Sequence, residues 1–81
     1  MTVEPDAVEW TRAHTIRVGR VSIEVTETST ESGPRYTFRV GRIAGKPGAE
    51  KRSGYLRARD VEDFLAAGDE LRDWLVAQDA A

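Results

Sequence analysis

Alternation of apolar and polar side chains through the middle of the chain is the feature that most limits its fold. Successive side chains of a β-strand point to opposite faces of a sheet, so a period of two predicts strands with one apolar face each. Residues 28–34, Thr-Ser-Thr-Glu-Ser-Gly-Pro, have the composition of a loop between two such strands. The alternating runs are Ile16 and Val18, then Val21, Ile23 and Val25, then Tyr36, Phe38 and Val40.

Two glycine–arginine pairs interrupt this alternation, and the parity of the apolar residues shifts after each. Residues 16–22 read Ile-Arg-Val-Gly-Arg-Val-Ser, and residues 38–44 read Phe-Arg-Val-Gly-Arg-Ile-Ala, a near-repeat at an interval of 22 residues. A β-bulge or a tight turn shifts parity in this way, and glycine is its usual marker. The repeat therefore predicts the same change of direction at Gly19–Arg20 and Gly41–Arg42, with chance repetition as the alternative.

From Arg59 the period becomes helical. The apolar residues after this point recur at i, i+3, i+4, i+7, i+10 and i+14, which predicts one stripe along a helix. Before the helix, a turn at Gly45–Gly48 precedes a last strand over Lys51–Arg57, in which Leu56 faces the core. The residues of the helical stripe are Val61, Phe64, Leu65, Gly68, Leu71 and Leu75.

The expected fold is α+β: a curved antiparallel four-stranded sheet followed by one C-terminal helix, in the order β-β-β-β-α. Residues 1–13 contain Pro5 and show no clear period, so they are expected to form a flexible N-terminal arm. Residues 14–81 are expected to form a single domain, because 81 residues leave no room for a second one.

Composition excludes several classes of site. The chain has no cysteine and a single histidine, His14, which excludes disulfides, a thiolate zinc site, a cysteine nucleophile and a multi-histidine metal cluster. No stretch approaches the roughly 18 apolar residues of a membrane span. Glu4, Asp6 and Glu9 make the N-terminus unlike a signal peptide. We expect a cytoplasmic protein that is not an enzyme and holds no metal or cofactor.

The small net charge of −2 conceals a strong segregation of charge along the chain. Residues 12–59 carry eleven basic and four acidic side chains, a local charge of +7. Residues 1–11 carry −3 and residues 60–81 carry −6, which restores the total of −2. Such segregation favours a basic surface for an anionic partner and a separate acidic face.

The face of the predicted sheet opposite the apolar residues is rich in arginine. Guanidinium groups pair with phosphates through two parallel hydrogen bonds and stack on bases, so this composition favours nucleic acid. The alternative is that the arginines pair across strands with Glu24 and Glu27 and only keep the sheet soluble. The shortage of acids on that face favours binding. The candidate nucleic-acid-binding residues are Arg17, Arg20, Arg35, Arg39, Arg42, Lys51, Arg52, Tyr55 and Arg57.

Two aromatic residues have candidate roles. Tyr55 is the expected stacking partner for a base because its parity takes it away from the core, although covering the edge of the core is the alternative. Trp74 lies beside Leu71 and Leu75 on the predicted helix. These three residues are the expected contact of a homodimer through the C-terminal helix, with packing inside one chain as the alternative.

Residues 14–78 resemble the single-stranded-DNA-binding transcriptional coactivators of the positive cofactor four family. The likeness rests on Ser-Gly-Tyr-Leu at residues 53–56, followed by Val61, Phe64 and Leu65, after a basic antiparallel sheet. In that family the helix pairs two subunits and the strands form grooves for single-stranded DNA. The resemblance implies a transcription or replication accessory role. It places Arg17, Arg20, Arg39, Arg42, Lys51, Arg52 and Arg57 near the bound strand.

A second resemblance, to the double-stranded-RNA-binding domain, rests on Ser-Gly-Pro-Arg-Tyr-Thr-Phe-Arg-Val at residues 32–40. That family also needs a long N-terminal helix and a lysine cluster at the start of its last helix. Here Pro5 interrupts the N-terminal segment, and Asp60, Glu62 and Asp63 would face phosphate. The first resemblance is therefore preferred, although its family does not share the acidic helix.

The leading hypothesis is a small dimeric protein that binds single-stranded nucleic acid, expected to be DNA, with little sequence preference. In this hypothesis the arginines contact phosphates and Tyr55 stacks on a base. The alternative, from another class, is a protein–protein interaction or regulatory module whose acidic C-terminal helix contacts a basic partner.

Overall fold

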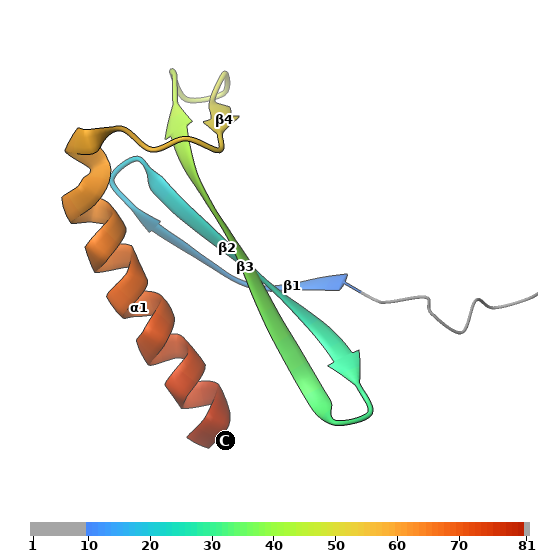
Figure 1. Ribbon diagram of the computed structural model, residues 1–81. Coiled ribbons are helices and arrows are strands. Elements are labelled where there is room, and N and C mark those ends of the chain that lie inside the picture. Colours follow the sequence, from blue (N-terminus) through green and yellow to red (C-terminus); the bar gives the residue numbers. More distant parts are fainter. Residues whose placement is uncertain (1–9, 81) are drawn as a thin grey trace, which may run out of the picture.

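Four strands and one long helix make up residues 10–80, the part of the chain that the structure, a computed structural model, describes (Figure 1). The strands pair antiparallel in the order in which they follow one another along the chain. The predicted α+β fold with the order β-β-β-β-α is confirmed. The elements are β1 (Trp10–Val18), β2 (Val21–Thr30), β3 (Gly33–Ala44), β4 (Lys51–Ser53), the 3₁₀ turn η1 (Ala58–Asp60) and α1 (Val61–Ala80).

A two-residue turn, Gly19–Arg20, joins β1 to β2 and explains the first shift of parity. Val18 pairs with Val21 across this turn, and Gly19 has a φ of 57°. Tight hairpin turns need a positive φ at a central position, which glycine adopts at little cost. The Arg20 carbonyl also accepts a 2.8 Å hydrogen bond from the Ile43 N–H, which ties the turn to β3.

The second glycine–arginine pair, Gly41–Arg42, lies inside an unbroken strand, so the prediction of a second bulge or turn is wrong. β3 stays in register with β2 up to the pair Val21–Arg42. Arg42 therefore occupies the inward position that the parity shift had assigned to Ile43. Ile43 lies on the other face of the sheet, where it pairs with Arg52 of the neighbouring strand β4. Of the two similar sequences, the first therefore forms a turn and the second continues a strand, because their tertiary contacts differ.

The observed bulge lies in β1 instead. β1 begins at Trp10, so residues 10–13, expected in the arm, belong to the sheet. The register with β2 shifts between Arg12 and His14, and one extra residue in a strand reverses its parity. Arg12 consequently shares a face with Arg17 although an odd number of positions separates them. Residues 1–9 of the predicted arm lie outside the described residues.

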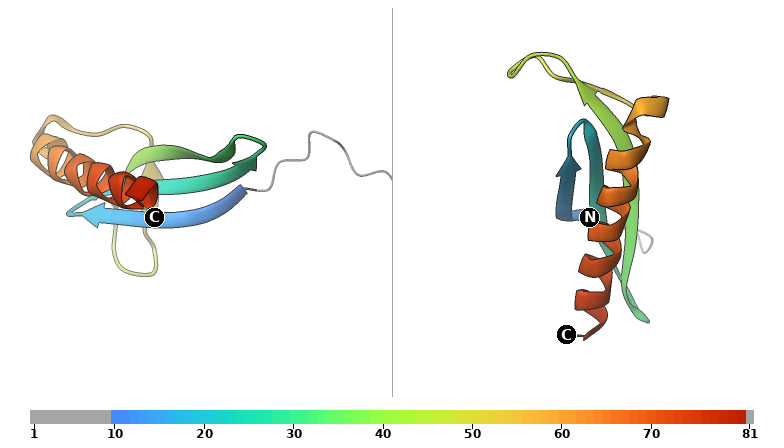
Figure 2. Two further views of the ribbon diagram at one scale, coloured as in Figure 1. Left: turned by 90° about the horizontal axis from the view of Figure 1, so that it is seen from below. Right: turned by 90° about the vertical axis from the view of Figure 1, so that its left-hand side faces the viewer.

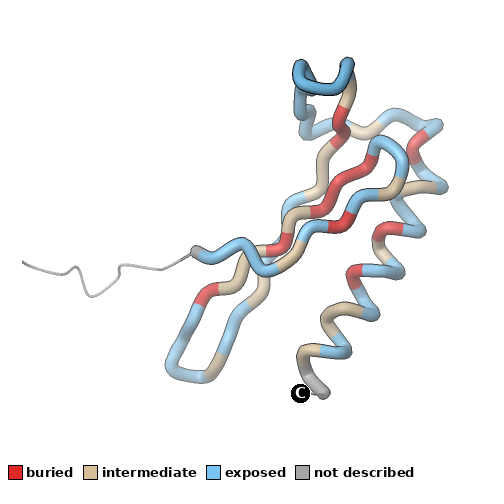
Figure 3. Tube along the Cα trace, turned by 180° about the vertical axis from the view of Figure 1, so that it is seen from behind, coloured by how far each residue is buried: buried red, intermediate tan, exposed pale blue. Residues whose placement is uncertain are grey.

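The core lies between α1 and the β1–β2 hairpin, on one face of the sheet (Figures 1 and 2). Buried residues concentrate in β2 and along the side of α1 that faces it (Figure 3). α1 packs chiefly across β1 and β2. Phe38 of β3, which the alternation assigned to the core, is therefore left 55% exposed. The buried apolar residues of this core are Ile16, Val21, Ile23, Val25, Ala67 and Leu71.

α1 presents to the sheet a side that differs from the predicted stripe. Ala67 and Leu71 are buried, whereas Val61 and Leu65 of the predicted stripe are 51% and 60% exposed. The first residue of the buried side is Asp60, which enters the sheet interface just before α1 begins. No helix in the described part of the chain combines the length and apolar character that crossing a membrane requires.

Trp74 anchors the second half of α1 to the sheet. Its ring stacks on His14 with the ring centres 5.1 Å apart and meets Tyr36 edge-on at 5.3 Å. Leu71 and Leu75 pack against the same core. Leu71, Trp74 and Leu75 thus contact their own sheet, which is the packing inside one chain that was the alternative to a homodimer contact.

A buried ion pair holds the start of α1 against β3. Arg42 Nε lies 2.9 Å from Asp60 Oδ2, and the two side chains are 8% and 5% exposed. The same carboxylate oxygen accepts a 2.8 Å hydrogen bond from the Arg57 N–H. The Arg57 hydrogen bond, together with the Arg42 guanidinium, lowers the pKa of Asp60 from its ordinary value of 3.8, against the opposing effect of burial.

Candidate nucleic-acid interface

The face of the sheet turned away from α1 carries arginines from three strands. By register, Arg12 and Arg17 of β1, Arg39 of β3 and Arg52 of β4 lie on this face. No helix among residues 10–80 covers it. The four side chains are between 48% and 74% exposed. We call this surface, with the acids Glu24 and Glu50 that contact it, the open face.

Glu24 lies at the centre of the open face and contacts three of its four arginines. Glu24 Oε2 is 3.8 Å from Arg12 Nη2 and 3.7 Å from Arg39 Nη2, and Oε1 contacts Arg52 Nη1. Only 14% of the Glu24 side chain is exposed. Because one carboxylate is shared by three guanidinium groups, it neutralises their charge only in part.

The fourth arginine is paired across the sheet. Arg17 Nη2 lies 2.9 Å from Glu50 Oε2. Glu50 directly precedes β4, so this pair links the β3–β4 connection to β1 over the intervening strands. Four guanidiniums against two carboxylates leave the open face a net charge of +2. The acids are fewer than the arginines, as expected, yet each of these arginines has a carboxylate partner.

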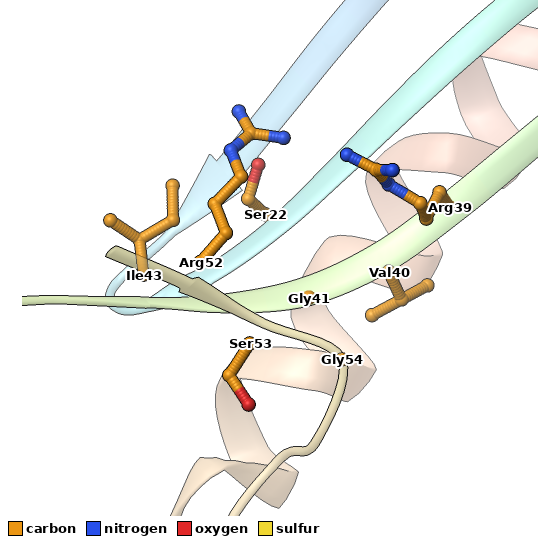
Figure 4. A pocket seen from close by; sticks show the side chains of 8 residues that line it. All are labelled: Ser22, Arg39, Val40, Gly41, Ile43, Arg52, Ser53 and Gly54. Carbon is orange, nitrogen blue, oxygen red and sulfur yellow. The ribbon is translucent and has the colours of Figure 1, made fainter. Parts of the chain in front are cut away.

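A pocket of about 230 Å³ opens where β2, β3 and β4 meet. The side chains of Arg39 and Arg52 extend toward one another over Ser22, whose hydroxyl points to the same side (Figure 4). Ser22 Oγ is buried and has no hydrogen-bond partner among the described residues. The lining residues are Ser22, Arg39, Val40, Gly41, Ile43, Arg52, Ser53 and Gly54.

Gly41 makes this junction possible. A Cβ at this position would lie 2.9 Å from the Ser53 carbonyl oxygen, closer than side-chain carbons approach backbone atoms. Glycine therefore allows β4 to pair closely with the end of β3. It also leaves the floor of the pocket without a side chain between Arg39 and Ile43. This close approach is the structural role of the second glycine–arginine pair.

Three of the predicted binding residues, Arg17, Arg39 and Arg52, meet on the open face. Arg42 does not, because its side chain is buried in the ion pair with Asp60 on the opposite face. Its prediction as an exposed nucleic-acid contact is therefore corrected: the strand continues through Gly41 without the expected shift, and the arginine turns inward.

The remaining predicted residues are exposed but dispersed. Arg20 lies in the β1–β2 turn, and Arg35 lies near the β2–β3 turn with the parity of the open face. Lys51 of β4 alternates with Arg52, so it lies on the other face, and Arg57 precedes η1. These four extend the basic surface around the sheet without joining the cluster on the open face.

Tyr55 lies in the connection after β4 rather than on a strand. The predicted last strand over Lys51–Arg57 ends at Ser53, where the Ser53 hydroxyl accepts a hydrogen bond from the Tyr55 N–H at 3.1 Å. Tyr55 is 83% exposed, whereas Leu56 packs against the core as predicted. Because Gly54 lines the pocket, Tyr55 follows directly after the pocket wall.

Sequence reasoning missed Arg12 and the roles of Glu24 and Ser22. Arg12 fell within the predicted arm, and the bulge at Ala13 gives it a face that simple alternation does not. Alternation gives both Glu24 and Ser22 the parity of the open face. The sequence pattern that could have identified them is an acidic and a small hydroxyl residue on a face rich in arginine. The contacts themselves depend on the pairing of β2 with β3, and of β3 with β4, which brings Arg39 and Arg52 close to them.

Comparison with known proteins gives no match: no protein-family model, no curated protein and no solved structure is matched by this chain.

Proposed function

We propose that the chain binds single-stranded nucleic acid on the open face, with little sequence preference. The observation that carries the proposal is the convergence of four arginines from three strands on a face that α1 leaves uncovered. Their net charge is positive and their side chains are at least 48% exposed. Phosphate contacts by such groups supply affinity without reading sequence.

The features around the open face also favour a single strand over a duplex. A single strand exposes its bases, and Tyr55, 83% exposed beside the pocket, offers a ring on which one base can stack. Stacking of this kind contributes about 1–3 kcal/mol per base. DNA rather than RNA is proposed because of the resemblance to single-stranded-DNA-binding coactivators.

Fluorescence anisotropy with a labelled single-stranded oligonucleotide tests this proposal. We expect binding at low salt, weaker binding to a duplex of the same length, and a loss of affinity in Arg39→Gln. The matched control is Arg72→Gln, which removes the same charge from the exposed side of α1, where Arg72 lies 3.4 Å from Asp69. No binding at low salt, or an equal loss in both variants, would contradict the proposal.

A second candidate function is supported by the exposed side of α1. Val61, Leu65 and Val76 are 51%, 60% and 61% exposed among the acids of this helix. Large apolar side chains on a charged helix favour a protein partner, either a basic one or a second copy of this chain. A homodimer through α1 would then use these residues, since Leu71, Trp74 and Leu75 already pack inside the chain.

Sedimentation velocity distinguishes these cases. A homodimer through α1 predicts a concentration-dependent dimer that Leu65→Gln weakens, whereas Arg39→Gln leaves it unchanged. A monomer at all concentrations, together with a pull-down whose recovered protein survives nuclease treatment, would favour the partner-binding function. If the chain is a monomer, the pull-down recovers no protein and the chain binds the oligonucleotide, only the nucleic-acid function remains.

A further inference from the structure

We infer that the pocket between Arg39 and Arg52 is a phosphate-binding subsite, and that Glu24 occupies its two arginines until a phosphate displaces it. The inference rests on the proposed function, which it deepens by naming one group of the strand and the residues that hold it. The ligand class is a phosphate oxyanion, whether a phosphodiester within a strand or a free phosphate.

The geometry of the pocket fits a tetrahedral oxyanion. Arg39 and Arg52 come from neighbouring strands and extend toward one another over the pocket (Figure 4). Two guanidinium groups that converge from opposite sides can each donate two hydrogen bonds to one phosphate. The volume of about 230 Å³ exceeds the roughly 30 Å³ share of a single water molecule several times.

Ser22 supplies an independent observation that points to a ligand. The residue is 3% exposed, and its hydroxyl oxygen has no hydrogen-bond partner in the described part of the protein. Most buried polar side-chain atoms are satisfied, so an unpaired hydroxyl in a pocket wall requires a reason. A phosphate oxygen between Arg39 and Arg52 would accept the hydrogen bond that Ser22 is free to donate.

Glu24 explains how two guanidiniums are kept together without a ligand. Arg39 and Arg52 would repel one another, and the Glu24 carboxylate contacts both of them. A phosphate must compete with this carboxylate for the same donors. Removing the Glu24 charge should therefore strengthen phosphate binding, whereas removing a carboxylate elsewhere should not.

The test titrates isotope-labelled chain with inorganic phosphate and, separately, with a single-stranded oligonucleotide, following the arginine Nε–H signals by NMR. We expect both ligands to shift the Arg39 and Arg52 signals. Glu24→Gln should tighten phosphate binding on the order of fivefold, because the phosphate then has no carboxylate to displace from Arg39 and Arg52. Glu70→Gln removes the same charge from an exposed position on α1 and should leave the affinity unchanged.

Ser22→Ala separates binding from folding. Because the hydroxyl is unpaired in the unliganded chain, its removal should leave the unfolding midpoint unchanged or raise it. Phosphate affinity should nevertheless fall at least about tenfold, the effect of one hydrogen bond to a charged group. Unchanged phosphate affinity in this variant would remove Ser22 from the site and overturn the inference.

The outcomes separate the subsite from the proposed function. If the oligonucleotide binds but the Arg39 and Arg52 signals stay still, or if Glu24→Gln and Glu70→Gln act equally, the subsite is overturned and the function stands. If phosphate shifts both signals but no oligonucleotide binds, the function is overturned and the subsite stands as a site for small phosphates. If neither ligand binds, both fail.

Discussion

Asp60 accepts hydrogen bonds from the Arg57 N–H and from Arg42 Nε, and its folded-state pKa is lower than 3.8. Well above pH 3.8 it is ionised in the folded and unfolded chains, so the stabilisation from these contacts is complete. As the pH falls, the unfolded chain takes up the proton first, and the stabilisation is lost through the lower folded pKa. We expect Asp60→Asn to be less stable than the wild type at neutral pH, and its stability to depend less on acid. Urea unfolding at a series of pH values from neutral to below 3.8 measures both effects.

The control for Asp60 is Glu62→Gln, an exposed acid at the start of the same helix, which should keep the acid sensitivity of the wild type. Because a broken buried pair leaves one charge unpaired, Arg42→Met with Asp60→Leu should be more stable than either single change. Equal pH profiles for Asp60→Asn and the wild type would contradict this account.

Gly19 combines a positive φ with a close approach to a side chain of α1. Its φ is 57°, and a Cβ there would lie 2.2 Å from Asp63 Oδ2. A left-handed conformation costs a non-glycine residue about 1–2 kcal/mol, and Asp63 must also move aside. We expect Gly19→Ala to lower the free energy of unfolding by more than Gly48→Ala, since Gly48 also has a positive φ, 86°, but nothing within 4 Å. Equal losses by chemical denaturation would show that the Asp63 contact is unimportant.

At the scale of the element, Gly68 weakens α1 without an evident gain. It lies in the middle of the helix, and a Cβ there would meet nothing within 4 Å. Glycine costs a helix about 1 kcal/mol relative to alanine. We expect Gly68→Ala to raise the free energy of unfolding by about this amount, measured by thermal and urea unfolding. A destabilised variant would instead indicate that Gly68 lies against a second chain, and would support the homodimer.

The type and order of the elements could be predicted because alternation and helical period are local signals. The predicted orientation of individual side chains was wrong where tertiary contacts determine it. Arg42 turns inward because Asp60 is there to pair with it, and Gly41 is required by the close approach of β4 rather than by a turn. α1 is rotated from its apolar stripe because Asp60 and Trp74 join its buried side. No period in the sequence reports contacts of this kind.

The same distinction holds for the candidate site. Alternation placed Arg17, Arg39 and Glu24 on the open face, since each lies within a continuous strand. It could not place Arg12, because the bulge at Ala13 lies before the alternation becomes clear. The pocket itself depends on which strands are neighbours, and a sequence does not state that order.

At the scale of the whole molecule, the segregation of charge predicts that the proposed binding of nucleic acid is sensitive to salt. If Arg39 and Arg52 share one phosphate and Arg12 and Arg17 neutralise one each, the logarithm of the affinity should fall with that of the salt concentration with a slope of about −2. A fourfold rise in salt should weaken binding about twentyfold. Anisotropy titrations at several salt concentrations measure this slope, and Arg17→Gln should reduce its magnitude by about 0.7. A slope near zero would show that the arginines do not contact phosphates.

The outer edge of β3 has a consequence for how the chain behaves in solution. Among residues 10–80, β4 covers that edge only at Arg42–Ala44, so the backbone of β3 from Gly33 onward is left unpaired on this side. Such an edge is a template for aggregation, which proline and charged side chains oppose. Pro34, Arg35 and Arg39 lie along it. Arg39, which is proposed to hold a phosphate, therefore also opposes pairing at this edge, and a variant that lacks it should be checked for self-association by light scattering before its lost affinity is interpreted.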